Sequence, residues 1–502
     1  MKANSALKIA HNYLQILLNS EKRASAAEKE VEKFFRVFLK DTPFSGKTYA
    51  VGGYVRDQYR SVLKNDPTIE PKDLDIVVEM DGGAEKITHF LKNKFDDIIS
   101  TPVQMGNYPI WQITFKKDIE YKNKTYKTKG AVIEFADTME EEFPDEKSRQ
   151  RKVKYAPLKK DIERRDFTFN MLLKDLTTGE IKDLTGLSKK DIEKGLLRHI
   201  TLEMLDKRFK EDPLRIIRLA RFAAIYDLDI PRSVLRIAKK NAERIKIVSR
   251  ERIRNELEKI MKVGKTKKAI QILKVIGILK LILPEVQALI GIQQGEKYHQ
   301  EGDVYRHTLK VLENAKPGIE NQIAALLHDI GKPVTQQILP DKITFYEHHD
   351  AGAEIARAIM KRLKFDKKTT DKVVTLVRRH MDPLRKKDMS DKNLRKYIRE
   401  VGDEIVDAVL DLAQADELGR LPPKNEIPDL KDRIEKIRKA PVKIEKKPIL
   451  NGKEIMELLD LEQGPKIGQA KEYLLELQDE YASKNEKLTK TKAKDLLLKK
   501  FK

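Results

Sequence analysis

The spacing of hydrophobic residues changes along this chain from helical to strand-like and back to helical. In residues 1–45 the hydrophobic positions recur at helical intervals and stop near Asp41-Thr-Pro43, which predicts an N-terminal helical extension without chemistry of its own. From Lys47 to Leu176 they form short alternating runs with helical stretches between them. Helical spacing then dominates the remaining residues. The pattern predicts an α+β fold with its strands in the first half of the chain.

Composition sets the number of domains and the chemistry of any metal site. A chain of 502 residues exceeds one hydrophobic core, so we expect about three or four domains. With 102 Lys and Arg against 80 Asp and Glu, the formal charge of +22 favours a polyanionic partner, although general solubility would also explain it. Because there is no cysteine, any metal must bind carboxylate or imidazole groups. The lack of a membrane-length apolar run and of a signal-peptide core predicts a cytoplasmic protein.

Two short motifs in the strand-rich region predict a site for phosphates and cations. Gly52 and Gly53 allow a tight turn whose amide groups can approach a phosphate, and Arg56 adds a guanidinium for the same anion. Asp73 and Asp75, two residues apart in a β-branched run, are expected on one face of a strand. Such a pair of carboxylates suits a divalent cation. Each motif alone is weak, because glycine turns and Asp-x-Asp pairs also occur without a ligand.

The order of these motifs resembles the nucleotidyltransferase superfamily of tRNA CCA-adding enzymes and bacterial poly(A) polymerases, whose head domain carries GGxVRD followed by DLDIV. The resemblance implies a head built on a mixed β-sheet flanked by helices. It implies that Asp73 and Asp75 bind Mg²⁺ and are catalytic. An acidic residue is frequent in this family where Glu134 stands, so Glu134 is a candidate third carboxylate.

A third motif, Arg164-Arg-Asp-Phe-Thr-Phe-Asn170, matches the RRDFTxN run of the same family. Arg165 can bind phosphate oxygens through a bidentate fork, and Asn170 can pair with a ribose hydroxyl. Asp166 belongs to the same predicted nucleotide site. The sequence departs from the family at Met139, where an arginine is usual, and this removes one candidate contact. The charged segment that follows, residues 140–154, is predicted to be a solvated loop; the family's loop here is associated with the switch from adding C to adding A.

The segment Glu211-Asp-Pro-Leu-Arg215 predicts how a base is chosen. Asp212 before a proline is a typical helix cap, and this structural interpretation stays open. Asp212 and Arg215 also share one helix face, so an acceptor and a donor lie side by side. Cytosine and adenine both present an amino donor beside a ring acceptor, whereas uracil and guanine do not. The resemblance implies that this EDxxR motif, with Arg218 beyond it, reads incoming CTP and ATP.

A second cluster of chemistry lies in the helical part, which holds most of the nine histidines. His-Asp at 328–329 and the residues around it resemble an HD phosphohydrolase domain. The resemblance implies a divalent metal of unknown identity and action on phosphoesters of RNA ends or nucleotides; an inactive helical spacer is the alternative. The matching positions are His307, His328, Asp329 and Asp416, with His348 and His380 at additional ligand positions.

These motifs together predict five segments: an extension at 1–45, a catalytic head at 46–180, a helical neck and body at 181–295, an HD domain at 296–425, and a tRNA-binding tail at 426–502. The expected activity is template-independent addition of CMP and AMP from CTP and ATP to the 3′ end of tRNA. Poly(A) synthesis, or addition of only CC or only A, is the alternative from the same class. An inactive RNA-binding scaffold is the alternative from another class.

Overall fold

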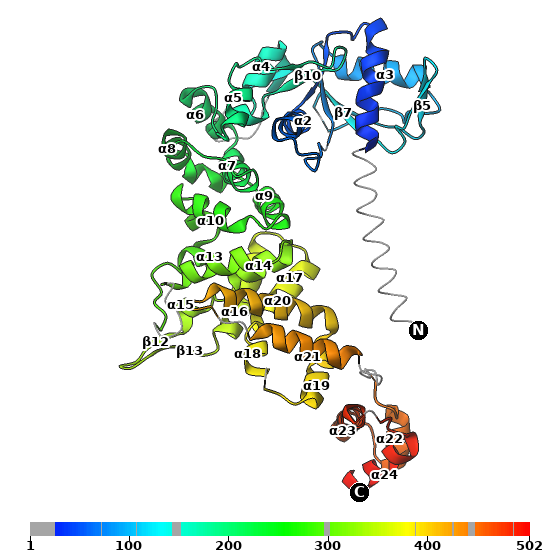
Figure 1. The fold of residues 1–502 in the computed structure, drawn as a ribbon, viewed down its shortest axis with the longest axis vertical. Helices are drawn as coiled ribbons and strands as arrows, with labels where there is room; N and C mark the ends of the chain where they lie inside the picture. The colour runs from blue at the N-terminus through cyan, green and yellow to red at the C-terminus, as the bar shows by residue number, and fades with distance from the viewer. Residues whose placement is uncertain are drawn as a thin grey trace. The chain divides into compact units, whose positions relative to one another are not determined.

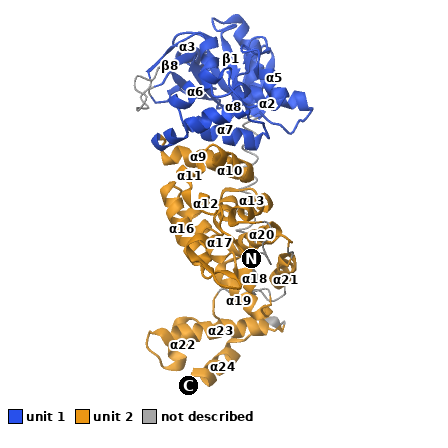
Figure 2. Cartoon of the chain, turned by 90° about the vertical axis from the view of Figure 1, so that its left-hand side faces the viewer, with its two compact units in different colours: residues 1–247 blue, residues 248–502 orange. Residues whose placement is uncertain are grey.

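The computed structural model describes residues 26–71, 73–106, 108–142, 152–295, 302–386, 388–423, 426–439, 447–484 and 486–501. The chain divides into two compact units, residues 1–247 and 248–502 (Figure 2). The first unit contains a seven-stranded sheet, and the described strands of the second are those of one hairpin, which confirms the α+β class. None of the described helices combines the length and apolar character needed to cross a membrane.

The sheet of the first unit is mixed, as expected, and runs in the order β11-β10-β1-β2-β7-β4-β3. Among its described ladders, β2 and β7 pair in parallel, and the others are antiparallel. The parallel pair lies near the centre of the sheet and carries Asp75 and Glu134. The strands of the whole sheet are β1 Thr48–Val51, β2 Asp75–Val78, β3 Val103–Gln104, β4 Ile110–Thr114, β7 Val132–Asp137, β10 Leu173–Asp175 and β11 Ile181–Lys182.

Helices pack on this sheet and continue beyond it within the first unit (Figure 1). Residues 26–38 form a helix whose aromatic side chains are fully buried, with the Phe34 ring 5.6 Å from that of Phe95 and the Phe35 ring 6.1 Å from that of Phe135. The described part of the predicted extension is therefore part of the head's core; residues 1–25 lie outside the described residues. The other helices are α2 Gly53–Lys64, α3 Gly83–Lys94, α4 Leu158–Glu163, α5 Ser188–Glu193, α6 Leu202–Glu211, α7 Leu214–Ile225 and α8 Arg232–Lys240.

The ends of the charged segment that was predicted as a loop are strands in the structure. Its two ends form an antiparallel pair, β8 Met139–Glu142 and β9 Lys152–Tyr155, and residues 143–151 lie outside the described residues. A Lys154 to Glu140 ion pair of 3.0 Å crosses the two strands. The prediction of a loop was wrong for these ends, because charge density hid cross-strand pairs of opposite sign that support a ladder. A further hairpin joins β5 Ile119–Tyr121 to β6 Lys124–Tyr126.

The second unit is built from helices that pack in successive groups (Figure 1). In the central group α13 packs on α20, and α17 packs on α14 and α16, which brings the histidine-bearing helices together. The hairpin β12 Gln336–Ile338 and β13 Ile343–Phe345 joins α15 to α16. The last three helices have a hydrophobic cluster of their own. The helices are α9 Arg250–Lys262, α10 Thr266–Val275, α11 Leu279–Ile282, α12 Pro284–Gln287, α13 Val304–Asn314, α14 Ile319–Leu327, α15 Lys332–Thr335, α16 His348–Arg362, α17 Lys367–Arg379, α18 Asp382–Lys386, α19 Asp391–Val401, α20 Asp403–Gly419, α21 Ile427–Lys439, α22 Gly452–Leu459, α23 Pro465–Ser483 and α24 Lys490–Phe501.

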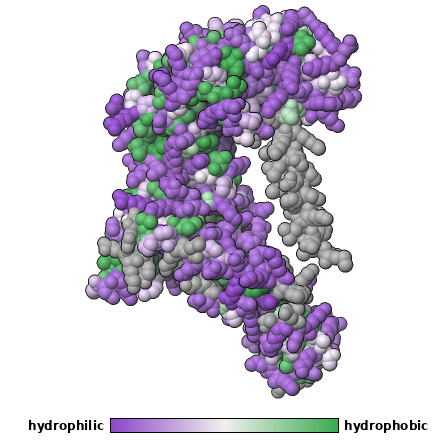
Figure 3. Space-filling view, in the orientation of Figure 1, coloured by the Kyte–Doolittle hydropathy of each residue, from purple (hydrophilic) through white to green (hydrophobic). Residues whose placement is uncertain are grey.

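The surface agrees with the charge-rich composition. The face drawn in Figure 3 is mostly hydrophilic, and hydrophobic residues are scattered over it in small groups. Large hydrophobic side chains that stay exposed include Val62 on α2 and Ile338 on β12.

Because the N-terminal helix lies in the core, shortening one of its buried side chains should lower the stability of the protein measurably. Val31 is fully buried, whereas Val62 is 81% exposed. Val31→Ala should lower the free energy of unfolding by about 1–2 kcal/mol, because buried methyl groups are lost and a small cavity remains. Val62→Ala is the matched control and should change stability by less than about 0.5 kcal/mol. The single tryptophan, Trp111 on β4, reports unfolding of this unit by its fluorescence in urea. Equal midpoints would show that the helix is not part of the core.

Candidate functional site

The carboxylates of the head meet at one end of the parallel strand pair. Asp75, the first residue of β2, lies in register with Glu134 on β7, so both side chains project from the same face of the sheet. Gln112, across from Glu134 on β4, donates a hydrogen bond from Nε2 to Glu134 Oε1 at 3.2 Å. The structure thus brings together two of the three predicted acidic residues by strand pairing alone.

Asp73 lies near Asp75, but it is in a turn before the strand and not on the strand as expected. It precedes the strand with a left-handed backbone (φ 58°), and its carbonyl accepts a hydrogen bond from the Asp75 N–H at 3.0 Å. The prediction that Asp73 lies on the strand is therefore wrong, because the pairing of β2 with β1 and β7 begins only at Asp75. Aspartate tolerates this conformation better than most residues. The turn still leaves the charges of Asp73 and Asp75 close enough to interact.

Crowding of negative charge makes this end of the sheet suited to a cation. Desolvation raises the pKa of Asp75 to about 6; Arg165 opposes the shift, and the charges of Glu134 and Asp73 add to it. Neighbouring carboxylates disfavour one another's ionisation, and a bound cation removes that penalty. Oxygen ligands are those that Mg²⁺ prefers. The donor set of Asp73, Asp75 and Glu134 therefore fits a hard divalent cation.

A cationic side chain lies between this carboxylate group and the glycine turn. Gly52 directly precedes α2 with φ 71°, a conformation that glycine adopts without strain. A side chain at Gly52 would place its Cβ 3.6 Å from Nη1 of Arg165. Arg165 donates from Nη2 to Asp161 at 3.1 Å, while its buried Nε has no hydrogen-bond partner among the described residues. The Gly52 turn and Arg165 thus form one side of a site for an anion next to the carboxylates.

Arg56, the other predicted phosphate ligand, is buried and already bonded. It forms two hydrogen bonds with Asp57, at 2.9 and 2.6 Å, one of 2.7 Å with Asn170 Oδ1, and one with the Tyr226 hydroxyl. Its guanidinium also lies 4.4 Å from the centre of the Tyr226 ring. Asn170 in turn donates to Asp166 at 3.0 Å. In this structure Arg56 and Asn170 connect neighbouring elements, and their contacts with phosphate and ribose stay predictions.

Asp166 joins the head to α7. It accepts hydrogen bonds from Arg218 Nε at 2.8 Å and from Arg218 Nη2. Although burial opposes ionisation, Arg218, Asn170 and Arg215 hold the pKa of Asp166 below its usual range. Since Arg165 faces the carboxylates and its neighbour Asp166 binds α7, two consecutive residues connect the cation site with the helix that begins after Asp212.

The two interpretations of the Asp212 and Arg215 motif, a helix cap and a pair that reads a base, are compatible with each other in the structure. Asp212 Oδ1 accepts from the Leu214 N–H at 3.3 Å, so Asp212 does cap the start of α7. The Asp212 and Arg215 charges are close enough to interact. Nη1 of Arg215 is buried and has no hydrogen-bond partner among the described residues. A buried donor without a partner is unfavourable in the protein alone, and an acceptor atom on a bound base would satisfy it.

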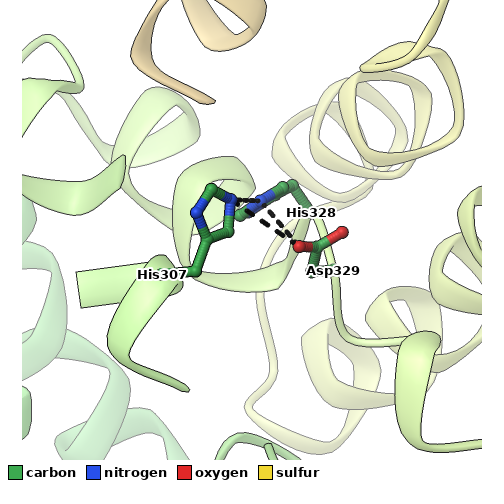
Figure 4. Close-up of side chains that lie close together, drawn as sticks. All are labelled: His307, His328 and Asp329. Atoms are coloured by element: carbon green, nitrogen blue, oxygen red, sulfur yellow. Dashed lines mark hydrogen bonds and ion pairs between the residues drawn. The ribbon is translucent and has the colours of Figure 1, made fainter. Parts of the chain in front are cut away.

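The histidines of the second unit converge on two carboxylates, as Figure 4 shows for His307, His328 and Asp329. Three of them use Nδ1 to bond a backbone carbonyl in their own segment: His328 to Ala325 at 2.9 Å, His348 to Phe345 at 2.8 Å and His380 to Val377 at 2.7 Å. A carbonyl oxygen can only accept, so Nδ1 carries a proton, which in the neutral imidazole leaves the Nε2 lone pair for a ligand. These Nε2 atoms face the cluster, which is the arrangement of metal ligands.

Asp329 lies at the centre of the cluster, and each of its two carboxylate oxygens faces a different pair of histidines. Its Oδ2 lies 3.2 Å from His328 Nε2 and 3.8 Å from His307 Nε2, whereas its Oδ1 lies 3.4 Å from His348 Nε2 and 3.9 Å from His380 Nε2. Asp416 completes the first group at 2.9 Å from His307 Nε2. Two ligand groups that share one carboxylate fit two neighbouring cations.

The protonation states of this cluster suit metal binding. Burial and the charges of His348 and His328 lower the pKa of His380 to about 3. Burial would raise the pKa of Asp329, but His328 and Lys332 bring it well below its usual range. Neutral imidazoles and ionised carboxylates are the forms that bind metals. His348 and His380 Nε2 atoms lie only 3.2 Å apart, which a cation between them would stabilise.

Comparison with known proteins matches the two regions of the chain that contain these clusters. The profile of the poly A polymerase head domain matches residues 48–198, and that of the probable RNA- and SrmB-binding site of polymerase A matches residues 227–290. The HD domain profile matches residues 304–421. A protein of Thermus thermophilus named CC-adding tRNA nucleotidyltransferase is 32% identical over 335 residues, which cover 64% of this chain and 74% of that protein. The chain belongs to the tRNA nucleotidyltransferase and poly(A) polymerase family.

Other members of the family share parts of the chain. The multifunctional CCA protein of Neisseria meningitidis is 36% identical over 231 residues, which cover 45% of this chain and 53% of that protein. The crystal structure of the Bacillus stearothermophilus CCA-adding enzyme in complex with CTP aligns with a TM-score of 0.62 at 18% identity, covering 96% of this chain and 97% of that one. This likeness shows that the fold of the nucleotidyltransferase family extends over nearly all of the chain.

One residue beside the nucleotidyltransferase site was missed by the sequence analysis. Glu28 is buried, and the Leu74 and Asp73 backbone N–H groups stabilise its carboxylate; burial, with the charge of Asp73, raises its pKa to about 7. Its Oε2 has no hydrogen-bond partner among the described residues. The available signal was a pair of acids, Glu28 and Glu32, on the same face of the N-terminal helix as Val31 and Phe35.

The shared position of Asp329 predicts a metal-binding defect that can be measured directly. Asp329→Asn keeps the side-chain shape but removes the charge between both ligand groups, and it should weaken metal binding by at least roughly tenfold. Asp350→Asn is the matched control, because Asp350 is an exposed carboxylate in the first turn of α16. Each variant is loaded with Mn²⁺, Ni²⁺ or Zn²⁺, desalted, and its metal content measured by mass spectrometry. Equal metal retention in both variants would contradict the assignment.

Proposed function

We propose that this chain adds CMP and AMP, taken from CTP and ATP, to the 3′ end of tRNA without a nucleic-acid template. The observation that supports this most is the connection through Arg165 and Asp166 in the first unit. It links the carboxylates that we propose bind cations, through Arg165, to the start of α7, where Asp212 and Arg215 lie. Relatives named for CC and CCA addition and for tRNA support the same reaction.

The chemical step joins the 3′ oxygen of the RNA to the α-phosphorus of the nucleotide, and pyrophosphate leaves. Arg165 and the backbone of the Gly52 turn would hold the triphosphate in place, because a guanidinium and amide groups both donate to phosphate oxygens. Arg56 and Asn170 would keep the start of α2 and the segment after Arg165 in register. Orientation of the two reactants then supplies a large share of the rate.

Asp73 and Asp75, with Glu134, would hold Mg²⁺ in the head. A bound Mg²⁺ supplies stabilisation of the negative charge on the reacting phosphate oxygens. The role of the protein residues is to fix the ligand oxygens: strand pairing positions Asp75 and Glu134, and the left-handed turn positions Asp73. In the second unit, the His and Asp cluster would hold divalent metal of unknown identity.

Asp212 and Arg215 would select the incoming base. The Asp212 carboxylate accepts from the amino group of cytosine or adenine, and Arg215 donates to the neighbouring ring nitrogen. Uracil and guanine present the opposite pattern, so they would leave a carboxylate facing a carbonyl and a donor facing an N–H. The Arg215 atom that lacks a partner supports this role. Arg218, which is bonded to Asp166, would hold α7 in place for this reading.

The HD domain would hydrolyse phosphoesters of RNA ends or nucleotides as a second activity. The complete ligand set, with Nδ1 of three histidines held by backbone carbonyls, supports an active site over an inactive helical spacer. The five-segment division of the chain, the binding of tRNA by residues 426–502 and a cytoplasmic location remain part of this proposal.

The first experiment asks whether Asp73 is required for nucleotide addition. Asp73→Ala should lower the rate by roughly a thousandfold or more, because loss of a metal ligand removes several kcal/mol of transition-state stabilisation. Radiolabelled CTP and ATP are supplied separately and together to tRNA that lacks all three or only the last of its terminal nucleotides. Circular dichroism checks that the fold is intact, and Asp329→Asn should retain addition. Persistent activity of Asp73→Ala would exclude the proposed site.

The same assay separates the alternatives within the family. The 32% identity with the Thermus protein favours CC addition as a second candidate. Incorporation of C from CTP without any incorporation of A would establish that candidate, and a long A tail on any RNA would establish poly(A) synthesis. Binding of tRNA without incorporation would establish the inactive scaffold.

The choice of base gives an independent test. Asp212→Ala should reduce the preference for CTP over UTP by about 10- to 100-fold, because a good bidentate pair discriminates by roughly 1–3 kcal/mol. The ratio of kcat/KM for CTP and UTP measures this effect. Glu203→Ala, at an exposed position in the first turn of α6, is the control and should leave the ratio unchanged. An unchanged ratio in Asp212→Ala would leave Asp212 as a helix cap alone.

A further inference from the structure

A cavity of about 370 Å³ opens beside the His and Asp cluster of the second unit. Asp329, His348 and Asp416 of the cluster contribute to its wall, so a molecule inside it lies against the proposed metal ligands. The volume is in the usual range of ligand pockets, roughly 300–1,000 Å³. The rest of the wall comes from Gly295, from Lys332 of α15, from β13 and the two residues after it, from Met381 and α18, and from Arg420 after α20.

The cationic side chains around this cavity are not equivalent. Lys332 Nζ lies 2.7 Å from Asp329 and 2.6 Å from Gln294, and Arg420 lies 2.7 Å from Asp416. Both are therefore neutralised by groups of the cluster itself. Arg385 on α18 also lines the cavity, is exposed, and forms no ion pair with any described residue. Among the described residues that line the cavity, Arg385 is thus the cation that an anion entering from outside can pair with.

An aromatic side chain lies at the same cavity. Tyr346 lines it and is 64% exposed, so its ring is accessible to a molecule in the cavity. It stands between Phe345, whose carbonyl accepts from His348 Nδ1 at 2.8 Å, and Glu347, whose left-handed backbone (φ 56°) turns the chain into α16. Tyr346 is therefore held two residues from a metal ligand by a fixed hydrogen bond and a fixed turn.

We propose that this cavity binds a nucleoside phosphoester, with the base stacked on Tyr346 and the phosphate held between Arg385 and the His and Asp cluster. Stacking on an aromatic ring accepts any base, and an unpaired guanidinium provides the donors that a phosphate requires. The proposal rests on the proposed phosphohydrolase activity of the HD domain and assigns its specificity-determining residues. Hydrolysis adds water across one P–O bond: the water oxygen bonds to phosphorus, and a water proton goes to the ribose oxygen that leaves.

Two cyclic phosphodiesters separate recognition of the base from recognition of the phosphate. Adenosine 2′,3′-cyclic phosphate carries a base, and glycerol 1,2-cyclic phosphate has the same five-membered ester without one. In the full chain, Tyr346→Ala should lower kcat/KM for the adenosine compound by roughly 5- to 100-fold and leave the glycerol compound unchanged. Tyr346→Phe should retain the wild-type ratio. Arg385→Ala should raise KM for both compounds.

Controls distinguish this proposal from a structural effect and from failure of the hydrolase itself. Ile338→Ala, at a 76% exposed position on the same hairpin, should behave as wild type. An equal loss on both compounds in Tyr346→Ala would overturn the stacking role. If the wild-type protein, loaded in turn with Mn²⁺, Ni²⁺ and Zn²⁺, hydrolyses neither compound, the proposed hydrolase activity is wrong, and the binding measurement below still decides the base site.

Photo-crosslinking tests binding without turnover. The full chain is irradiated with 8-azidoadenosine 3′-monophosphate in the presence of excess CTP, which occupies the head, and labelled peptides are mapped. We expect label on the peptide that contains Tyr346 and its loss in Tyr346→Ala; label confined to other peptides would overturn the proposal. A short RNA with a 2′,3′-cyclic phosphate end, compared with the free nucleotide in both assays, identifies which source the cavity prefers.

Discussion

The ion pair between Asp166 and Arg218 is the interaction on which the nucleotidyltransferase site depends. It is largely buried, and it attaches α7 to the segment that also carries Arg165. Removing one member of such a pair typically costs about 3–5 kcal/mol, because the remaining charge stays without a partner. The consequence for function is geometric. The helix that begins after Asp212 is attached to the segment of Arg165, so Asp212, Arg215 and the carboxylate group belong to one connected arrangement.

This arrangement explains why residues with similar chemistry have different roles. Arg56 and Arg165 both lie near the glycine turn, and sequence alone assigns both to phosphate. In the structure, Arg56 is enclosed by Asp57, Asn170 and Tyr226, whereas Arg165 keeps its Nε unpartnered among the described residues and faces Asp75. A guanidinium has five N–H donors, and what decides its role is how many are already bonded. Sequence motifs specify the residue type, and packing decides which donors remain.

The same limit applies to the fold. The β-branched run of residues 75–78 and the alternation of residues 132–137 were enough to predict the strands that carry Asp75 and Glu134. They were not enough to show that Asp73 leaves the ladder, since strand ends depend on the length of neighbouring strands. The β8 and β9 ends of the charged segment were missed because opposite charges across a ladder look like a solvated loop when read in order along the chain. Glu28 was missed because its partner, the Asp73 turn, is distant in sequence.

The two candidate cation sites differ in their donor atoms and in what positions them. In the head, the donors are carboxylates: desolvation, with the charges of Glu134 and Asp73, raises the pKa of Asp75 to about 6, and a bound cation would relieve the repulsion among them. In the HD domain, the candidate ligands are buried, and hydrogen bonds from Nδ1 to backbone carbonyls orient His328, His348 and His380. Strand pairing and one turn therefore position the donors of the first site, whereas side-chain bonds to the backbone position those of the second.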